Sequence, residues 1–70
     1  LQQDKDKKSW PKLVGMNKED AIVVIKTQNP SLNVIPVPEN SMVTMDYRLD
    51  RVRVFYNEET NKVVYEPNLG

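Results

Sequence analysis

The hydrophobic residues of the chain are grouped in segments, and the first segment has the spacing of a helix. Its apolar residues recur at intervals of three and four positions, at Ala21, Val24 and Ile25. Asn17 precedes this pattern as a residue type that caps helix N-termini, whereas Pro30 cannot continue a helix and pushes Asn29 out of the helical conformation. We therefore predict one helix over residues 18–28.

A strand is predicted after the helix, although one proline limits where it can lie. Residues 32–37 are rich in the β-branched side chains that favour strands, namely Val34, Ile35 and Val37. Pro36 has no amide hydrogen to donate to a neighbouring strand, so it fits an edge, an end or the mouth of a loop. The pattern predicts a largely buried strand over residues 32–37.

The clearest strand pattern comes after a long connection, at residues 51–56. Valine and arginine alternate there, and alternate side chains of a strand point to opposite faces of a sheet. Val52 and Val54 can therefore face a core. Arg51 and Arg53 would then share the opposite face.

A polar turn at residues 57–62 and a short last strand at residues 63–65, ended by Pro67, are predicted next. The order of helix, strand, long loop, strand, turn and short strand predicts a single small α+β domain, with one helix packed on one face of a small sheet. The predicted core residues are Trp10, Val14, Ala21, Val24, Ile25, Ile35, Val52 and Val54.

Composition limits what such a domain can do. The chain has 70 residues, 10 Lys and Arg against 10 Asp and Glu, and neither cysteine nor histidine. It therefore lacks the residues for a disulfide, a Cys/His zinc site or a nucleophile paired with histidine. Zero net charge argues against nucleic acid as a partner, and the longest apolar run is too short to span a bilayer. We expect a soluble monomer that is not an enzyme and needs no metal or other cofactor.

The chain is expected to divide into an arm and a domain. Residues 1–9 are mostly polar and lack apolar periodicity, which predicts a flexible N-terminal arm. Trp10 and Pro11 start the ordered part, so the domain is expected over residues 10–70. No signal-peptide pattern occurs in the chain. Secretion and delivery to a vacuole both stay open, because a cysteine-free chain suits any redox compartment.

The connection between the two long strands points to a function. A loop of this length in so small a domain is usually either functional or disordered, and this one contains no glycine. It carries apolar side chains on a segment expected to be exposed, at Met42, Val43, Met45 and Tyr47. An exposed apolar segment held between strands suits insertion into another protein's cleft, which is how proteases read peptides.

Four stretches of the sequence carry a resemblance: SWPKLVG at residues 9–15, VTMDYR at residues 43–48, DRVRVF at residues 50–55, and Gly70. Together they closely resemble the potato inhibitor I family of serine-protease inhibitors, over essentially all of residues 10–70. The resemblance implies a wedge-shaped domain whose small mixed sheet has two long parallel strands. An extended reactive-site loop would join those two strands, without the disulfide that many members of the family have.

The resemblance also implies which residues would meet a protease. The scissile bond would join Met45 and Asp46, with Met45 in the primary specificity pocket of the enzyme. The other loop residues expected to contact the protease are Ser41, Met42, Val43, Thr44, Tyr47 and Arg48. Because Met45 is long, unbranched and apolar, its burial would contribute roughly 1.5 to 3 kcal/mol. It favours subtilisin-like and chymotrypsin-like proteases, and elastase-like or cathepsin G-like ones, over trypsin, whose pocket selects a cation.

A stiff reactive-site loop would distinguish such an inhibitor from an ordinary substrate. By resemblance, Arg51 and Arg53 reach under the loop, where their expected partners are Thr44 and Asp46. Gly70 is expected to help hold the two arginines. Shielded charge-assisted hydrogen bonds of this kind are worth about 1.5 to 3 kcal/mol. A stiff loop loses little entropy on binding and keeps its cleaved ends together, so hydrolysis would be slow.

A second interpretation stays open from the sequence. A subtilisin-type propeptide is also small, cysteine-free and α+β, and it acts as a folding chaperone and inhibitor through its C-terminal tail. The two interpretations differ in where they place the contact with the protease. A loop inhibitor would depend on Met45, whereas a propeptide would depend on its last residues.

Overall fold

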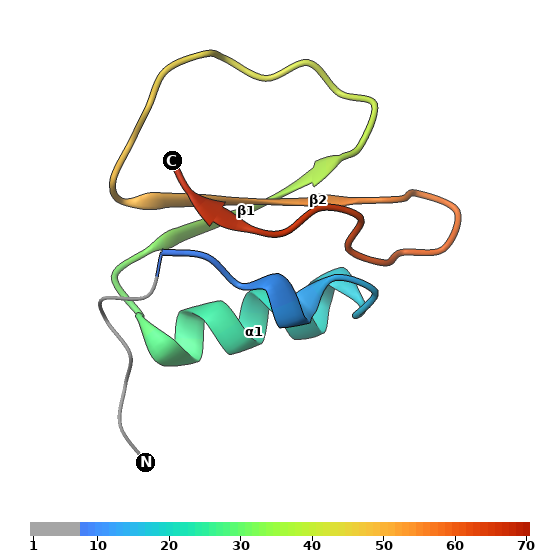
Figure 1. The fold of residues 1–70 in the computed structure, drawn as a ribbon, viewed down its shortest axis with the longest axis horizontal. Helices are drawn as coiled ribbons and strands as arrows, with labels where there is room; N and C mark the ends of the chain where they lie inside the picture. The colour runs from blue at the N-terminus through green and yellow to red at the C-terminus, as the bar shows by residue number, and fades with distance from the viewer. Residues whose placement is uncertain (1–7) are drawn as a thin grey trace.

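A single α-helix covers one face of a three-stranded sheet in the computed structural model, which describes residues 8–70 (Figure 1). The elements are η1 (Pro11–Leu13), α1 (Lys18–Gln28), β1 (Asn33–Pro38), β2 (Arg51–Tyr56) and β3 (Asn68–Leu69). This is the predicted α+β fold, and both α1 and β2 begin and end at the predicted residues. Within the described residues no helix is both long and apolar enough to cross a membrane.

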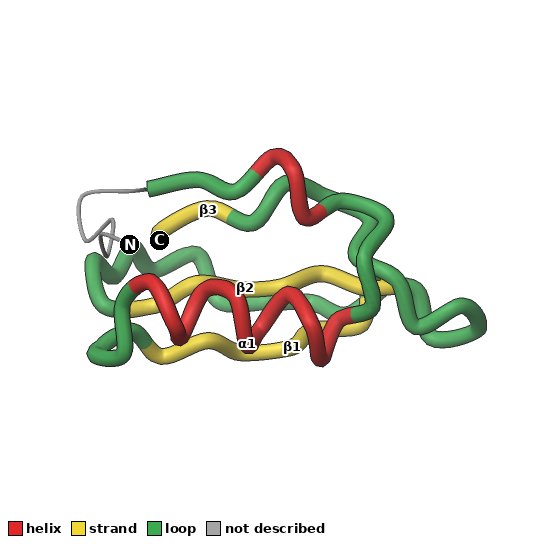
Figure 2. The backbone as a smooth tube through the Cα atoms, turned by 90° about the horizontal axis from the view of Figure 1, so that it is seen from below, coloured by secondary structure: helices red, strands yellow, loops and turns green. Residues whose placement is uncertain are grey.

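The sheet has the order β1-β2-β3, with β1 parallel to β2 and β3 antiparallel to it. α1 runs along β1 and β2 rather than along β3 (Figure 2). Pro36 therefore lies in an edge strand, which is one of the places predicted for it. Parallel neighbours need a crossover connection, and the crossover is most often a helix. Here the crossover is an extended loop at residues 39–50, on the side of the sheet away from α1 (Figure 1).

The core lies between α1 and the sheet face that α1 covers. Its buried residues are Trp10, Leu13, Ala21, Ile25, Leu32, Val52, Val54 and Val63. The alternation predicted for β2 is confirmed, because Val52 and Val54 are fully buried in this core while Arg51 and Arg53 extend to the loop side. The Trp10 indole N–H donates to the Gln28 side-chain oxygen at 2.7 Å, which satisfies the one polar atom of that side chain.

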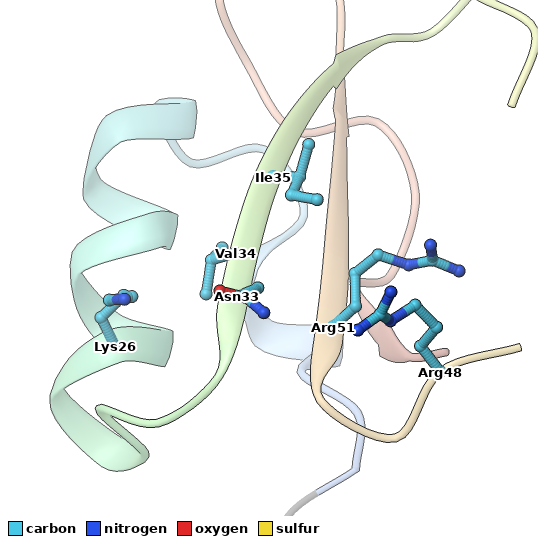
Figure 3. A pocket seen from close by; sticks show the side chains of 6 residues that line it. All are labelled: Lys26, Asn33, Val34, Ile35, Arg48 and Arg51. Carbon is cyan, nitrogen blue, oxygen red and sulfur yellow. The ribbon is translucent and has the colours of Figure 1, made fainter.

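Two residues predicted for the core are on the surface instead: Val14 is 47% exposed and Ile35 is 42% exposed. Val34 packs against the core, so the strand alternation turns Ile35 to the loop side of β1, where no helix covers it (Figure 3). Leu13 takes the buried position next to Val14. Val24, also predicted for the core, packs against it but is only half-buried.

The last strand lies elsewhere than predicted. Residues 63–65 were expected to form it, but β3 is Asn68–Leu69, beyond Pro67. Val63 makes only an isolated bridge to Tyr56, and its backbone is held instead by the segment before α1. Gly15 N–H donates to the Val63 carbonyl, and Val63 N–H donates to the Met16 carbonyl, both at 2.8 Å. Val63 is thus bonded to a segment distant in sequence, while Val64 N–H donates to the Phe55 carbonyl of β2 at 2.9 Å.

Asn17 occupies the N-cap position of α1, as predicted, but its side chain makes no capping hydrogen bond. Lys18 N–H instead donates to the backbone carbonyl of Asn61 at 3.0 Å. The Asn61 side chain accepts from Lys18 Nζ and donates to a Glu19 carboxylate oxygen, both at 2.6 Å. Asn61 has a φ of 61°, a left-handed conformation that asparagine tolerates better than most residues. The polar turn thereby ties down the first turn of the helix.

The two ends of the described chain run beside the sheet. Leu69 N–H in β3 donates to the Lys8 carbonyl at 2.8 Å, and Ser9 forms an antiparallel bridge with Asn68. The other residues of the predicted arm, 1–7, lie outside the described part of the chain.

Candidate functional site

The loop at residues 39–50 presents its side chains to solvent along most of its length. Every residue from 41 to 50 is exposed. Met42 is 98% exposed and Met45 is 97% exposed, which is unusual for large apolar side chains. Tyr47 and Leu49 are exposed as well. Such a concentration of apolar side chains on one loop marks a surface that binds another molecule.

Both ends of the loop are tied to the strands that it joins. At its start, Glu39 N–H donates to the Tyr56 carbonyl at 2.8 Å, and Ser41 N–H closes a turn onto the Pro38 carbonyl at 2.9 Å. At its end, Asn33 N–H donates to the Asp50 carbonyl at 2.7 Å. These bonds limit the movement of the loop to the part between residues 41 and 49.

Arg48 and Asp50 stiffen the return to β2. Arg48 Nε and Nη2 donate to the two carboxylate oxygens of Asp50 at 3.0 and 3.1 Å, a bidentate arrangement. The hydrogen bonds from Arg48 hold the pKa of Asp50 below its ordinary value. The side-chain amide of Asn33 donates more weakly to the same carboxylate, at 3.4 Å.

Arg51 is the principal support beneath the loop. Although it carries a full charge, it is only 8% exposed. Its Nη1 donates to Asp46 Oδ2 at 3.1 Å and its Nη2 to the Asp46 backbone carbonyl at 2.8 Å. Its Nε donates to the Gly70 carbonyl at 3.0 Å. One guanidinium therefore joins the loop, β2 and the segment that ends at Gly70.

Arg53 supports the loop at Thr44, two residues before Asp46. Its Nη2 donates to the Thr44 hydroxyl oxygen at 3.0 Å and lies 3.7 Å from Asp46 Oδ1. The Thr44 hydroxyl in turn donates to Asp46 Oδ1. A chain of hydrogen bonds thus runs from Arg53 through Thr44 to Asp46, where it meets the bonds from Arg51.

The side chains of three consecutive loop residues point in alternating directions. Thr44 and Asp46 point down to the arginines, so Met45 between them points out to solvent, as expected for an extended chain. The hydrogen bond from the Thr44 hydroxyl, followed by that from Arg51, holds the pKa of Asp46 below its ordinary value. Asp46 is therefore ionised at neutral pH and attracts both arginines.

The sequence-predicted residues divide into two groups. The structure brings Thr44, Asp46, Arg51, Arg53 and Gly70 into one connected network. Ser41, Met42, Val43, Met45, Tyr47 and Arg48 lie along the exposed strip of the loop. Asn33 was not predicted as part of the site, because its role depends on the register of β1 against β2. The bond between Thr44 and Asp46 was not predicted either, although residues two apart in an extended segment share a side.

An open cavity of about 360 Å³ lies beside the returning end of the loop (Figure 3). Its lining residues are Lys26, Asn33, Val34, Ile35, Arg48 and Arg51. The cations of the cavity already have partners, because Lys26 Nζ donates to the Leu32 carbonyl at 3.2 Å and the two arginines bind Asp50 and Asp46. Within the described residues no acidic, cysteine or histidine side chains gather into a metal site. The braced loop is therefore the candidate site.

Known proteins are similar to this chain over nearly its whole length. The sequence profile of the potato inhibitor I family matches residues 2–70. The protein named subtilisin inhibitor CLSI-I, from Canavalia lineata, is 44% identical over 64 residues, which cover 91% of this chain and 95% of that protein. The protein named chymotrypsin inhibitor, from Lumbricus terrestris, is 44% identical over 55 residues, which cover 79% of this chain and 64% of that protein. The crystal structure of bitter gourd trypsin inhibitor superposes with a TM-score of 0.86 at 39% identity and covers 91% of this chain and 93% of that one.

Proposed function

Because the chain belongs to the potato inhibitor I family, we propose that it inhibits serine proteases by presenting its loop as a slowly cleaved substrate. The chain is an inhibitor and not an enzyme, since the family and the similar proteins named above are protease inhibitors. Nothing in these matches supports the alternative of a subtilisin-type propeptide that acts through its C-terminal tail.

The observation that carries the proposal is the position of Met45 between two braced neighbours. Thr44 and Asp46 are held to β2 by arginines, whereas the Met45 side chain is free to enter a pocket. We assign the bond between Met45 and Asp46 as the scissile bond. Residues 41–44 would bind on its acyl side, and Tyr47 and Arg48 on its leaving side. Extended chains bind protease clefts in this manner, with backbone hydrogen bonds for affinity and side-chain pockets for specificity.

The arginines explain why such a loop would inhibit. If a protease cuts after Met45, Arg53 still holds Thr44 on one side of the cut and Arg51 still holds Asp46 on the other. The new carboxyl and amino groups therefore remain close together, and their high effective concentration favours resynthesis of the bond over release. A loop ordered before binding also loses little conformational entropy when it binds.

Met45 defines the enzymes that the chain should inhibit. An unbranched apolar side chain suits the large apolar pockets of subtilisin-like and chymotrypsin-like proteases, and those of elastase-like or cathepsin G-like enzymes. Trypsin should be inhibited weakly, because its pocket contains a carboxylate that selects a cation. This preference rests on Met45, whereas several of the similar proteins, the bitter gourd inhibitor among them, are named as trypsin inhibitors.

A titration of residual activity tests the proposal. Subtilisin, chymotrypsin and trypsin are each incubated with increasing amounts of the chain and assayed with small chromogenic substrates. We expect the first two enzymes to titrate at one inhibitor chain per enzyme, because each chain carries one loop, and trypsin to keep its activity. If none of the three is inhibited, the proposed function is wrong.

Two methionine variants locate the contact. Met45→Asp should abolish inhibition, because a carboxylate in an apolar pocket is strongly unfavourable. Met42→Asp is the comparison on the same loop: Met42 is equally exposed and also expected to contact the protease, but it lies three residues before Met45, so its loss should be smaller. Equal losses in the two variants would contradict the assignment of Met45 to the specificity pocket.

A further inference from the structure

Gly70 lies directly against the aromatic ring of Tyr47. A methyl group on Gly70 would come within 3.2 Å of Cε1 and 3.3 Å of Cδ1 of that ring. These distances are shorter than ordinary van der Waals contact, so only a residue without a side chain fits there without displacing the ring. Gly70 also has a φ of +145°, a conformation that residues with a Cβ rarely adopt.

Two backbone bonds determine the position of Gly70. Its N–H donates to the Arg51 carbonyl at 2.8 Å, and its carbonyl accepts from Arg51 Nε at 3.0 Å. Gly70 is therefore fixed to the same residue of β2 whose guanidinium holds Asp46. The ring of Tyr47 consequently rests on a backbone segment that cannot easily yield.

We infer that Gly70 is a positioning residue for Tyr47, and thereby for the leaving side of the loop, an inference that rests on the proposed function. Tyr47 comes directly after Asp46, the last loop residue that Arg51 holds, and before the paired Arg48. The contact with Gly70 sets how far this stretch stands above β2. A side chain at position 70 would force the Tyr47 ring, or the loop backbone that carries it, to shift by a few tenths of an ångström.

Kinetics with a matched glycine control test this inference. Gly70→Ala should raise the inhibition constant for subtilisin about tenfold or more and should speed cleavage of the Met45-Asp46 bond. Gly15→Ala is the control: Gly15 has a φ of +89°, but a methyl group there would meet nothing within 4 Å. Both variants should lose stability through backbone strain, whereas only Gly70→Ala should change the inhibition constant. Equal inhibition constants for the two folded variants would overturn the inference.

A double-mutant cycle isolates the contact from the bonds that Gly70 makes with Arg51. In a Tyr47→Ala background the ring is absent, so adding Gly70→Ala should change the inhibition constant less than twofold. If Gly70→Ala has its full effect in that background, the effect does not pass through Tyr47 and the inference is wrong.

Proton NMR of the free chain provides a readout that needs no protease. The ring current of Tyr47 should shift the Hα resonances of Gly70 away from their ordinary positions, and Tyr47→Ala should return them there. Unshifted Hα resonances in the unmodified chain would overturn the inference. The two proposals fail separately, because absence of inhibition by the unmodified chain contradicts the proposed function and leaves this NMR result intact.

Discussion

The guanidinium of Arg51 donates to the backbone carbonyl of Asp46 at 2.8 Å and to its carboxylate at 3.1 Å, so one buried cation grips both the main chain and the side chain of the same loop residue. A side chain that hydrogen-bonds only to a mobile carboxylate would leave the backbone free to rotate. Gripping the carbonyl as well fixes the peptide unit just after the proposed scissile bond.

Removal of Arg51 should convert the inhibitor toward a substrate. Arg51→Ala deletes three hydrogen-bonded contacts, to Asp46 and Gly70, and we expect a loss of about 1.5 to 3 kcal/mol in the free energy of unfolding. The inhibition constant should rise on the order of tenfold to a hundredfold, with faster cleavage after Met45. Inhibition constants and mass-spectrometric cleavage rates measure these effects.

Two further variants complete that experiment. Arg51→Lys should recover only part of the inhibition, because a single ammonium group cannot reproduce the planar fork of a guanidinium. Arg53→Ala should have a smaller effect than Arg51→Ala, since Arg53 donates one hydrogen bond to the loop, through Thr44. If all three variants inhibit and resist cleavage as the unmodified chain does, the two arginines do not brace the loop.

Oxidation should weaken inhibition more through Met45 than through Met42. Both side chains are almost fully exposed, so mild peroxide should convert both to sulfoxides, but only the sulfoxide at Met45 would enter the primary specificity pocket. Met45→Leu should therefore lose less affinity after peroxide than Met42→Leu does. Inhibition constants are measured before and after treatment, with mass spectrometry of each product. The reverse order of sensitivity would contradict the assignment.

Acid should loosen the loop through Asp46. Its pKa lies below the ordinary value of 3.8, first because of the Thr44 hydroxyl and then because of Arg51. A carboxyl group with a lowered pKa in the folded state adds stability above its unfolded pKa, and this stability disappears as the pH falls through the folded pKa. We expect the free energy of unfolding to be level at neutral pH and to fall in the acid range below that ordinary value.

Asp46→Asn separates the loss of stability in acid that comes from Asp46 from the loss that comes from other carboxylates. The pKa of Asp50 is lowered by Arg48, and that of Glu19 is lowered mainly by a backbone hydrogen bond, so both add to the same acid loss. Urea unfolding across the acid range should show a shallower decline for Asp46→Asn than for the unmodified chain. Identical declines would show that Asp46 is not coupled to folding.

Core truncation should reduce stability without changing specificity. Ile25 is fully buried in α1, and Ile25→Ala should lower the free energy of unfolding by about 2 to 5 kcal/mol. Val23→Ala is the control in the same helix: Val23 is 62% exposed, and alanine has the higher helix propensity. Its stability should be unchanged or slightly raised. Both variants should keep the inhibition constant of the unmodified chain under conditions where they remain folded, and a changed constant would mean that the loop depends on core packing.

Local patterns in the sequence were sufficient for α1 and β2. The helix was predicted from the spacing of Ala21, Val24 and Ile25, and β2 from the alternation at residues 51–56, and both have the predicted bounds. These patterns are reliable because each element buries one face of its own. The exposed apolar strip of the loop was also predicted from the sequence. Met42 and Met45 lie in the connection between two predicted strands, where the loop offers them no apolar partner.

Contacts between residues far apart in the sequence decided the features that local patterns did not predict. Val63 pairs with the segment before α1 rather than in a last strand, the first turn of α1 is held by Asn61 rather than by Asn17, and Ile35 faces the loop side of β1.

The sequence by itself determined α1, β2 and which loop is exposed, because side-chain periodicity records one-sided burial. Only the tertiary structure decided that Gly70 lies under Tyr47 and that Arg51 holds Asp46 through both its carboxylate and its carbonyl. The physical reason is that strand register places these atoms to within an ångström, and register is set by the packing of the whole domain.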